Sequence, residues 1–327
     1  AGQRPSQRMA RKYRFDDPDM DPFFMAALGW GPTGGLDIGQ ARYVASKITD
    51  GDGDSWVQAF SSYGELLNAE ADAWKQRGWQ RAAGEARLKA FASYRSSWQF
   101  AGPGEQFEAL VAKHKAAFVT AMSELGLPAT FFQVPYAGKQ LPGVFLQNAE
   151  RKAPVVLVIG GADTCFEDLF LTLGRNLLDR GYSVALADLP GQGITMAGGL
   201  PWEAQAEKPI TAVTDLLVER FGAEPGRMAL IGLSLGGYFV ARAAGYDKRF
   251  ATVIASTPLP DPAQLFALSF HAAMNAGGTP TLAALRSALV SLWKAGAKVP
   301  QEFIPRTPGM VADPSLATVP FLSILGS

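Results

Sequence analysis

The sequence predicts an α/β protein with a doubly wound, mostly parallel β-sheet in its second half and an all-helical region before it. One observation behind this prediction is that short apolar runs alternate with helical segments after residue 127. The runs are almost continuously apolar, as the strands of a parallel sheet are when helices cover both of its faces. The other observation is that apolar residues before residue 127 recur at helical spacing.

The first half of the chain contains three expected helices, over residues 55–76, 81–100 and 105–126. In the first of them Val57, Phe60 and Leu67 fall near one stripe, which gives the helix an apolar face for a core. Gly126 is expected to stop the last helix. We therefore assign residues 1–127 to a helical N-terminal cap domain.

The second half alternates expected strands with expected helices. The strands are expected within residues 130–135, 141–148, 154–161, 182–191, 227–234, 251–257 and 319–326. Helices expected over 167–181 and 207–222 provide crossover connections between parallel strands. We assign residues 128–327 to the α/β domain, with a helical lid insertion around 262–312.

Charge and hydropathy exclude several classes of partner. The chain has 30 Lys and Arg residues against 30 Asp and Glu residues, so no bulk charge draws it to nucleic acid or to an anionic membrane. No apolar stretch reaches the roughly 18 residues that a membrane span needs, and the N-terminus lacks the apolar core of a signal peptide. We therefore expect a cytoplasmic protein. The single cysteine, Cys165, excludes an internal disulfide and is expected to be a small, inert residue in a partly buried loop.

One serine lies where a nucleophile is expected. Residues 228–232 predict a strand, residues 235–245 predict a helix, and Ser234 lies between them in the pattern Gly-x-Ser-x-Gly. Such a tight strand-to-helix turn holds its serine in a strained backbone conformation at the carboxyl end of the sheet. Gly232 and Gly236 are expected there because a β-carbon at either position would crowd the neighbouring chain. We predict Ser234 as a catalytic nucleophile, with a purely structural tight turn as the alternative.

Acyl transfer also needs hydrogen-bond donors for the oxyanion that forms on attack. One expected donor is the backbone N–H of Leu235, the residue after the nucleophile. The other is expected from the glycine-rich loop at 160–162, where Ala162 is the first choice and Gly161 the neighbouring candidate. A glycine turn that only closes the strand is the alternative. Asp163 either points into the substrate pocket or caps the helix that follows.

Several stretches resemble a known family: "VPYAGKQLPGVFL", "VLVIGGADTCFEDL", "DLPGQG", "GLSLGGYFVARAA" and the helical "AEADAWKQRGWQRAAGEARLKAFASYRSS". The chain resembles α/β-hydrolases of the FrsA-like esterase group, which includes dihydropseudooxynicotine hydrolase, a carbon–carbon bond hydrolase. The resemblance spans most of the sequence. It implies an α/β-hydrolase fold whose N-terminal helices cover the active site, with Ser234 as nucleophile and Leu235 and Ala162 as oxyanion donors. Aromatic residues of the helical half are candidates for lining the pocket, with a plain core role as the alternative: Tyr63, Tyr94 and Trp98.

A serine nucleophile needs a base, and the expected base is not present in the usual place. In α/β-hydrolases the order is Ser, then Asp or Glu, then His, but the run at 319–326, expected to carry the acid, is the last one in the sequence. The acid and the histidine are therefore expected beyond Ser327. A ligand-binding relic and an enzyme with a rewired base are the alternatives.

The sequence holds two histidines. His114 lies on the apolar stripe of an expected helix, where a packed and hydrogen-bonded core residue is expected. His271 lies in the lid segment and is the candidate for a rewired base, for which Asp261 or Asp313 would have to supply the acid.

The sequence as a whole predicts a serine hydrolase that cleaves an ester, a thioester or an activated C–C (ketone) bond of a small organic substrate through an acyl-enzyme on Ser234. A catalytically inactive small-molecule-binding protein on the same scaffold is the alternative. No cofactor and no metal is implied, because acyl chemistry at such a site needs neither. The expected partner is a small-molecule substrate, with neither nucleic acid nor a membrane, and a homodimer is left open.

Overall fold

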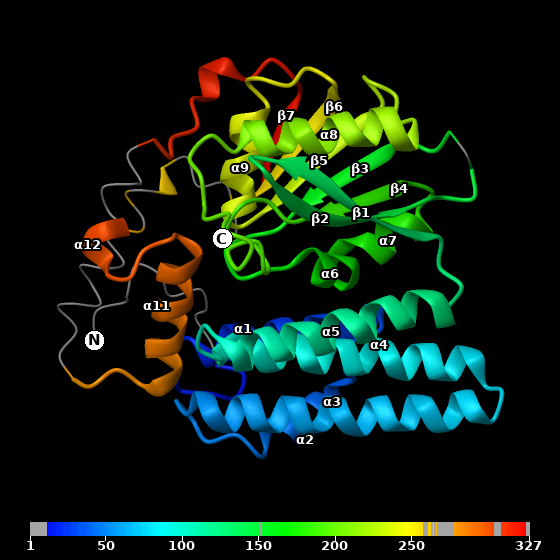
Figure 1. The fold of residues 1–327 in the computed structure, drawn as a ribbon, viewed down its shortest axis with the longest axis vertical. Coiled ribbons are helices and arrows are strands. Elements are labelled where there is room, and N and C mark those ends of the chain that lie inside the picture. Colours follow the sequence, from blue (N-terminus) through cyan, green and yellow to red (C-terminus); the bar gives the residue numbers. More distant parts are fainter. Residues whose placement is uncertain are drawn as a thin grey trace. The chain divides into compact units, whose positions relative to one another are not determined.

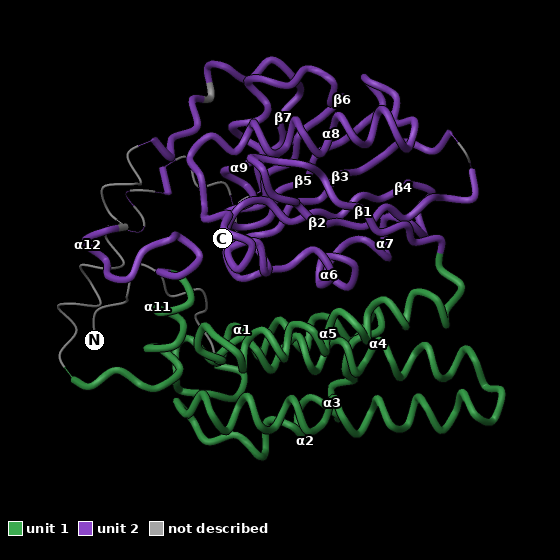
Figure 2. The backbone as a smooth tube through the Cα atoms, in the orientation of Figure 1, with its two compact units in different colours: residues 1–127, 272–291 green, residues 128–271, 292–327 purple. Residues whose placement is uncertain are grey.

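The computed structural model describes residues 12–150, 152–257, 261, 262, 264, 266, 278–303 and 309–324. The chain forms two compact units (Figure 2). Unit 1 comprises residues 1–127 and 272–291, and unit 2 comprises residues 128–271 and 292–327. The first part of unit 1 ends at the residue where the sequence analysis places the boundary of the helical domain. Within the described ranges no helix has both the length and the apolar character needed to cross a membrane.

Unit 1 is built from helices, of which α3, α4 and α5 are the long ones (Figure 1). Its elements are α1 (Met20–Gly29), η1 (Gly31–Thr33), α2 (Ile38–Ala45), α3 (Gly53–Gln76), α4 (Gln80–Ser97), η2 (Trp98–Phe100), α5 (Glu105–Glu124) and most of α11 (Leu282–Lys294). The three helices that the sequence predicts correspond to α3, α4 and α5, and these predictions are confirmed.

Aromatic side chains fill the interior of unit 1. Trp56 of α3 is fully buried, and its ring centroid lies 4.8 Å from that of Phe60 and 5.0 Å from that of Phe100. Such aromatic pairs contribute about 0.5–1.5 kcal/mol each beyond the burial of their area. Trp56 Nε1 donates to the carbonyl oxygen of Ser96 at 2.8 Å, so its polar atom keeps a hydrogen bond in the core. Unit 1 therefore has a core of its own.

Residues 281–291 pack with the helices of unit 1, whereas the sequence analysis places them in a lid insertion of the α/β domain. Arg286 donates to the carbonyl oxygen of Phe100 at 2.9 Å and forms an ion pair with Asp54 at 2.6 Å. These charge-assisted bonds attach the first part of α11 to the ends of η2 and α3. The predicted lid range, 262–312, is thus divided between the two units.

Unit 2 contains a seven-stranded sheet in the order β1-β2-β4-β3-β5-β6-β7. The strands are β1 (Ala129–Tyr136), β2 (Lys139–Leu146), β3 (Val155–Ile159), β4 (Ser183–Ala187), β5 (Met228–Leu233), β6 (Phe250–Ser256) and β7 (Phe321–Ile324). The pairs β1–β2 and β2–β4 are antiparallel, and the other neighbours are parallel. Each predicted apolar run forms a strand, so the predicted fold class is confirmed.

Helices cover both faces of this sheet (Figure 1). The helical elements of unit 2 are α6 (Phe166–Leu169), the π-helical η3 (Phe170–Gly174), α7 (Arg175–Asp179), α8 (Glu207–Phe221), α9 (Leu235–Ala243), α12 (Pro300–Phe303) and η5 (Pro314–Leu316). In β3, Val155, Leu157 and Ile159 join the core cluster to which α8 and α9 contribute. Val156 and Val158 point to the opposite face. All five are buried, which explains why the run is continuously apolar.

The connections of β3 create the place where a site can form. β3 pairs with β4 on one side and with β5 on the other, so the loops that leave the carboxyl ends of β3 and β5 are neighbours. Open α/β sheets bind ligands at such a switch point. Ile159, the last residue of β3, is opposite Gly232, so the loop after β3 begins beside the turn after β5.

Candidate active site

The turn after β5 holds Ser234 in an unusual backbone conformation. Ser234 has φ 56° and ψ −122°, a combination that costs on the order of 1–3 kcal/mol for a residue with a side chain. Its N–H donates to the carbonyl oxygen of Ser256 at 3.0 Å, and its own carbonyl oxygen accepts from the N–H of Gly237 at 2.8 Å. The strained turn that the sequence predicts is therefore present, and Ser234 is partly exposed at the end of β5.

The glycines on either side of Ser234 leave no room for side chains. A Cβ on Gly232 would lie 2.1 Å from the carbonyl oxygen of Gly236, and a Cβ on Gly236 would lie 2.4 Å from the carbonyl oxygen of Gly160. These distances are far below ordinary contact, so strand, helix and the loop after β3 can approach one another only because both residues are glycine. This is the crowding that the sequence analysis predicts.

The loop after β3 reaches the side chain of Ser234. A Cβ on Gly161 would lie 2.9 Å from the Cβ of Ser234 and 3.3 Å from its Oγ. The loop backbone therefore passes directly beside the Ser234 side chain, at a distance that only glycine permits. Ala162 follows and is partly exposed. The structure thus brings the predicted oxyanion loop, residues 160–162, together with the predicted nucleophile.

The carbonyl groups of this loop are held by side chains from elsewhere in unit 2. Gln192 Nε2 donates to the carbonyl oxygens of Gly160 at 2.5 Å and Gly161 at 3.0 Å. Lys294 Nζ donates to the carbonyl oxygen of Ala162 at 2.7 Å. These hydrogen bonds give the loop a fixed backbone orientation, although it belongs to no helix or strand.

Two backbone N–H groups beside Ser234 are the predicted oxyanion donors. Leu235 is the first residue of α9, so its N–H has no acceptor within the helix and lies in the positive end of the helix dipole. The N–H of Ala162 shares a peptide group with the carbonyl of Gly161, which accepts from Gln192. Since the N–H and C=O of a trans peptide point in opposite directions, this N–H points away from Gln192. Such donors stabilise the negative oxygen that forms during acyl transfer.

A protein-family model described as the alpha/beta hydrolase family matches residues 155–325, a range that includes β3, the loop after it and the turn at Ser234. The chain belongs to the alpha/beta hydrolase family. The resemblance from which the sequence analysis predicts this fold is confirmed at that level.

Two curated relatives of this hydrolase-family chain are themselves named as hydrolases. The 20-hydroxy-prefusarin hydrolase FUS2 of Gibberella moniliformis is 30% identical over 250 residues, which cover 72% of this chain and 60% of the relative. Hydrolase acrC of Aspergillus aculeatus is 28% identical over 266 residues, which cover 74% of this chain and 62% of the relative. The chain thus spans about three-fifths of the length of these relatives.

Two solved structures share the fold of this hydrolase-family chain. The crystal structure of the 2,6-dihydroxy-pseudo-oxynicotine hydrolase matches with a TM-score of 0.66 at 20% identity, covering 91% of this chain and 88% of the other. The structure of wild-type AbyA5 matches with a TM-score of 0.67 at 16% identity, covering 93% of this chain and 78% of the other. The similarity shows a shared fold over most of the chain.

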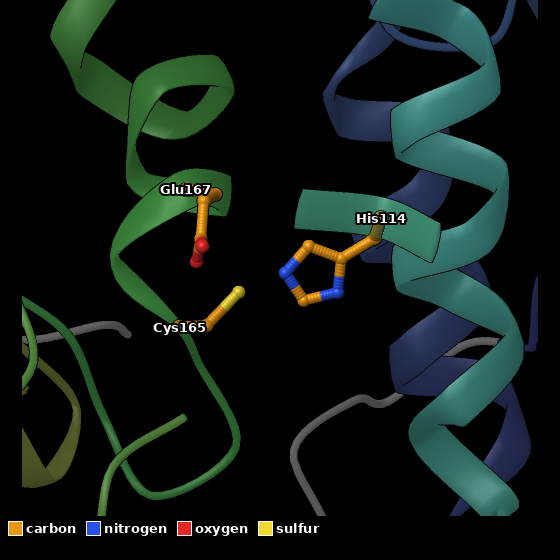
Figure 3. Close-up of side chains that lie close together, drawn as sticks. All are labelled: His114, Cys165 and Glu167. Carbon is orange, nitrogen blue, oxygen red and sulfur yellow. The ribbon is translucent and has the colours of Figure 1, made fainter. Parts of the chain in front are cut away.

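The start of α6 in this alpha/beta hydrolase bears on one of the two roles expected of Asp163, that of a helix cap. The N-cap residue of α6 is Cys165 and not Asp163, and the carboxylate of Asp168 accepts from the N–H of Cys165 at 3.4 Å. Cys165 is buried and forms no disulfide, and Glu167 in the first helical turn is buried as well (Figure 3). Asp163 is partly exposed in the turn after Ala162, and its place in the substrate pocket stays a prediction.

The predicted aromatic pocket residues lie in unit 1. Trp98 and Tyr94 are buried, and Tyr63 is partly exposed. Trp98 Nε1 donates to Nδ1 of His114, fully buried on α5 (Figure 3), at 2.8 Å. The prediction of a packed, hydrogen-bonded core histidine is therefore confirmed. A role of the three aromatic residues in substrate binding stays a prediction, and His271 lies outside the described residues.

A separate polar hollow in unit 2 does not include the nucleophile. It has a volume of about 480 Å³ and is lined by Tyr136, Glu203, Ala204, Gln205, Lys208, Arg242 and Gly309. The hydroxyl of Tyr136 donates to the carboxylate of Glu203, and burial raises the pKa of Glu203 above its ordinary value. Arg242 lies about 12 Å beyond Ser234 along α9, so this hollow is distinct from the loop and turn that flank Ser234.

The sequence analysis missed Gln192 and Lys294. Gln192 belongs to the stretch "DLPGQG", which carries part of the family resemblance, but its partners lie more than 30 positions earlier in the chain. Lys294 interrupts the apolar stretch "LVSLWKAGA", and a lysine in such a stretch is a weak signal of a buried, paired amine. Neither pattern identifies the carbonyl group that accepts the hydrogen bond.

Proposed function

We propose that this protein is a serine hydrolase that forms an acyl-enzyme on Ser234 and cleaves an ester, a thioester or an activated C–C (ketone) bond of a small organic substrate. The observation that carries the proposal is the approach of the glycine loop to the strained turn: a Cβ on Gly161 would lie 3.3 Å from the Oγ of Ser234. This approach supports an arrangement in which a nucleophile and two backbone N–H donors face one region, as acyl transfer requires.

The chemistry follows from this arrangement. Oγ of Ser234 attacks the carbonyl carbon of the substrate while a general base takes the hydroxyl proton, and the carbonyl oxygen becomes negative. The N–H groups of Leu235 and Ala162 donate to this oxygen. When the tetrahedral intermediate collapses, the alcohol, thiol or carbon leaving group departs with a proton, and water then releases the acid from Ser234 by the same steps.

The relatives support the hydrolytic class. Curated proteins at about 30% identity are named as hydrolases, among them a 20-hydroxy-prefusarin hydrolase. One structure with the same fold is named as a 2,6-dihydroxy-pseudo-oxynicotine hydrolase. These names support a small organic substrate. Ester and C–C cleavage begin with the same nucleophile and differ in the leaving group that must be stabilised, so both stay within the proposal.

Hydrolysis of p-nitrophenyl acetate by the full-length protein tests the proposal. We expect turnover in the wild type and a loss of at least about 1000-fold in kcat/KM for Ser234→Ala, because nothing replaces the nucleophile. Ser123→Ala, at an exposed position of α5, is the matched control and should keep wild-type activity. Equal activity in the wild type and Ser234→Ala would refute the proposal. Absence of both turnover and acylation in the wild type would favour a binding protein.

A further inference from the structure

Two side chains hold three consecutive carbonyl groups of the loop beside the nucleophile. Gln192 donates to Gly160 at 2.5 Å and to Gly161 at 3.0 Å, and Lys294 donates to Ala162 at 2.7 Å. We call Gln192 and Lys294 the carbonyl clamp. Because both residues are distant in sequence from the loop, the conformation of the loop depends on the tertiary fold as well as on its own glycines.

The two clamp residues are deeply buried. Gln192 is 0% exposed and Lys294 is 1% exposed. A buried polar side chain costs free energy unless acceptors satisfy it, and a buried ammonium costs more than a buried amide. A lysine at this depth is therefore unusual. The hydrogen bonds to the loop carbonyl groups offset part of the free-energy cost of burying each clamp residue. The loop and the clamp therefore stabilise one another.

Further hydrogen bonds fix the direction of each clamp side chain. The N–H of Leu189 donates to Oε1 of Gln192 at 2.9 Å, which leaves the NH₂ group of the amide to face the loop. The N–H of Trp202 donates to the backbone carbonyl oxygen of Lys294 at 2.9 Å. The neighbouring Ala295 is buried in a small apolar cluster, so the backbone from which the ammonium extends is anchored on both sides.

The clamp determines the direction of the N–H that the proposed reaction uses. The N–H of Ala162 and the C=O of Gly161 belong to one planar peptide group and point in opposite directions. The Gly161 oxygen accepts from Gln192 and from the hydroxyl of Thr164, the latter at 3.2 Å. Hydrogen bonds to the oxygen of a peptide polarise the group and make its N–H a better donor. The next peptide is fixed by a charge-assisted bond from Lys294.

We propose that the carbonyl clamp aims the N–H of Ala162 at the substrate oxyanion, with Lys294 as a positioning residue that also supplies a fixed positive charge behind the loop. This inference rests on the proposed function of Ser234. Neither clamp residue needs to touch the reacting atoms. Because the negative oxygen exists only after attack, aiming and charge stabilise the transition state more than the bound substrate. The clamp should therefore affect kcat and leave KM nearly unchanged.

Lys294→Met removes the ammonium and keeps a side chain of similar length. We expect kcat for p-nitrophenyl acetate to fall about 10- to 100-fold, with KM within about twofold, because the donor is misaimed but still present; outright removal of a donor typically costs about 100- to 1000-fold. The rate is expressed per active site titrated with a fluorophosphonate, so misfolded molecules do not enter it.

Two further variants separate the cation from simple packing. Lys298→Met changes an exposed lysine of the same segment and should leave kcat at the wild-type value. Lys294→Arg keeps a cationic donor at the clamp position and should recover at least about threefold of the kcat lost in Lys294→Met. Thermal unfolding of each variant accompanies the kinetics.

A kcat per titrated site within about twofold of wild type in Lys294→Met would overturn the inference. Equal losses in the Met and Arg variants would overturn it as well, because they would trace the effect to packing. A failure of the proposed function would be detected in the wild-type protein and not in the clamp variants, because the wild type would then take no fluorophosphonate adduct on Ser234.

Discussion

The turn at Ser234 and the loop at 160–162 lie side by side, yet they are held in different ways. In the turn no side chain does the holding: Gly232 and Gly236 remove the atoms that would clash, and backbone hydrogen bonds to Ser256 and Gly237 close it. The loop is held from outside, by Gln192 and by a lysine about 130 positions later in the chain. The conformation at Ser234 thus rests on glycines and backbone hydrogen bonds, whereas the proposed oxyanion donor depends on side chains from distant residues.

This difference separates two kinds of mutational effect. A Cβ added at Gly232 or Gly236 would clash with backbone atoms that cannot move aside. Such a substitution should therefore act mainly on the free energy of unfolding. A substitution that loosens the loop leaves the nucleophile in place but misaims the donor, so it should act mainly on kcat. The predictions below test this separation.

Gly232→Ala should produce the largest effect, on stability. The added Cβ would meet the backbone oxygen of Gly236 at 2.1 Å, and the loss in the free energy of unfolding should be about 3 kcal/mol, near the upper end of typical overpacking. Urea unfolding measures it. Gly39→Ala is the matched control, because nothing lies within 4 Å of the added Cβ in α2; it should be neutral or stabilising by up to about 1 kcal/mol. Equal stability of both variants would contradict the steric account.

Gln192→Leu should separate the loop from the turn. It removes the donors to Gly160 and Gly161 while keeping similar volume, so kcat for p-nitrophenyl acetate should fall about tenfold or more, with KM nearly unchanged. The free energy of unfolding should fall by about 1–3 kcal/mol, because buried polar groups lose hydrogen bonds that Gln192 makes. Ser234 should still be fully phosphonylated by a fluorophosphonate, but more slowly. A wild-type kcat would show that the loop holds its conformation without Gln192.

Gly161→Ala tests the contact between the two regions. The new methyl group would lie 2.9 Å from the Cβ of Ser234, closer than an ordinary contact, so the loop or Ser234 must shift. We expect a loss of about tenfold in kcat/KM, equivalent to about 1.4 kcal/mol, and a smaller loss of stability than in Gly232→Ala. A wild-type kcat/KM would mean that the loop moves away from Ser234 at little cost.

Glu203→Gln should have the smallest effect and lies outside both regions. Burial raises the pKa of Glu203 above its ordinary value of 4.5, so ionisation opposes folding. The folded wild type is stabilised by the protonated carboxyl of Glu203, and this contribution is lost as the pH rises from the pKa of Glu203 in the unfolded chain to its pKa in the folded protein. Glutamine does not titrate, so the variant has no such loss. Urea unfolding between pH 4 and pH 8 should therefore show the variant gaining stability relative to wild type as the pH rises. A difference that is constant with pH would show that the pKa is not raised.

The fold and the strained turn at Ser234 could be predicted from the sequence because apolar runs and glycine spacing signal them directly. A continuously apolar run such as Val155–Ile159 predicts a strand covered on both faces, and the glycine spacing around Ser234 predicts the turn. The packing partner of residues 281–291 could not be predicted, because helical periodicity does not say against which partner a helix packs; here Arg286 attaches α11 to unit 1. Long-range hydrogen bonds such as that of Lys294 leave no pattern in a single sequence.

The central claim is that the turn after β5 carries a reactive serine. The most direct test is the intact mass of the full-length protein after treatment with a fluorophosphonate, which phosphonylates an activated serine with loss of fluoride. The account predicts one adduct on the wild type and none on Ser234→Ala. An adduct that persists in Ser234→Ala, or a wild-type protein that takes none, would contradict it.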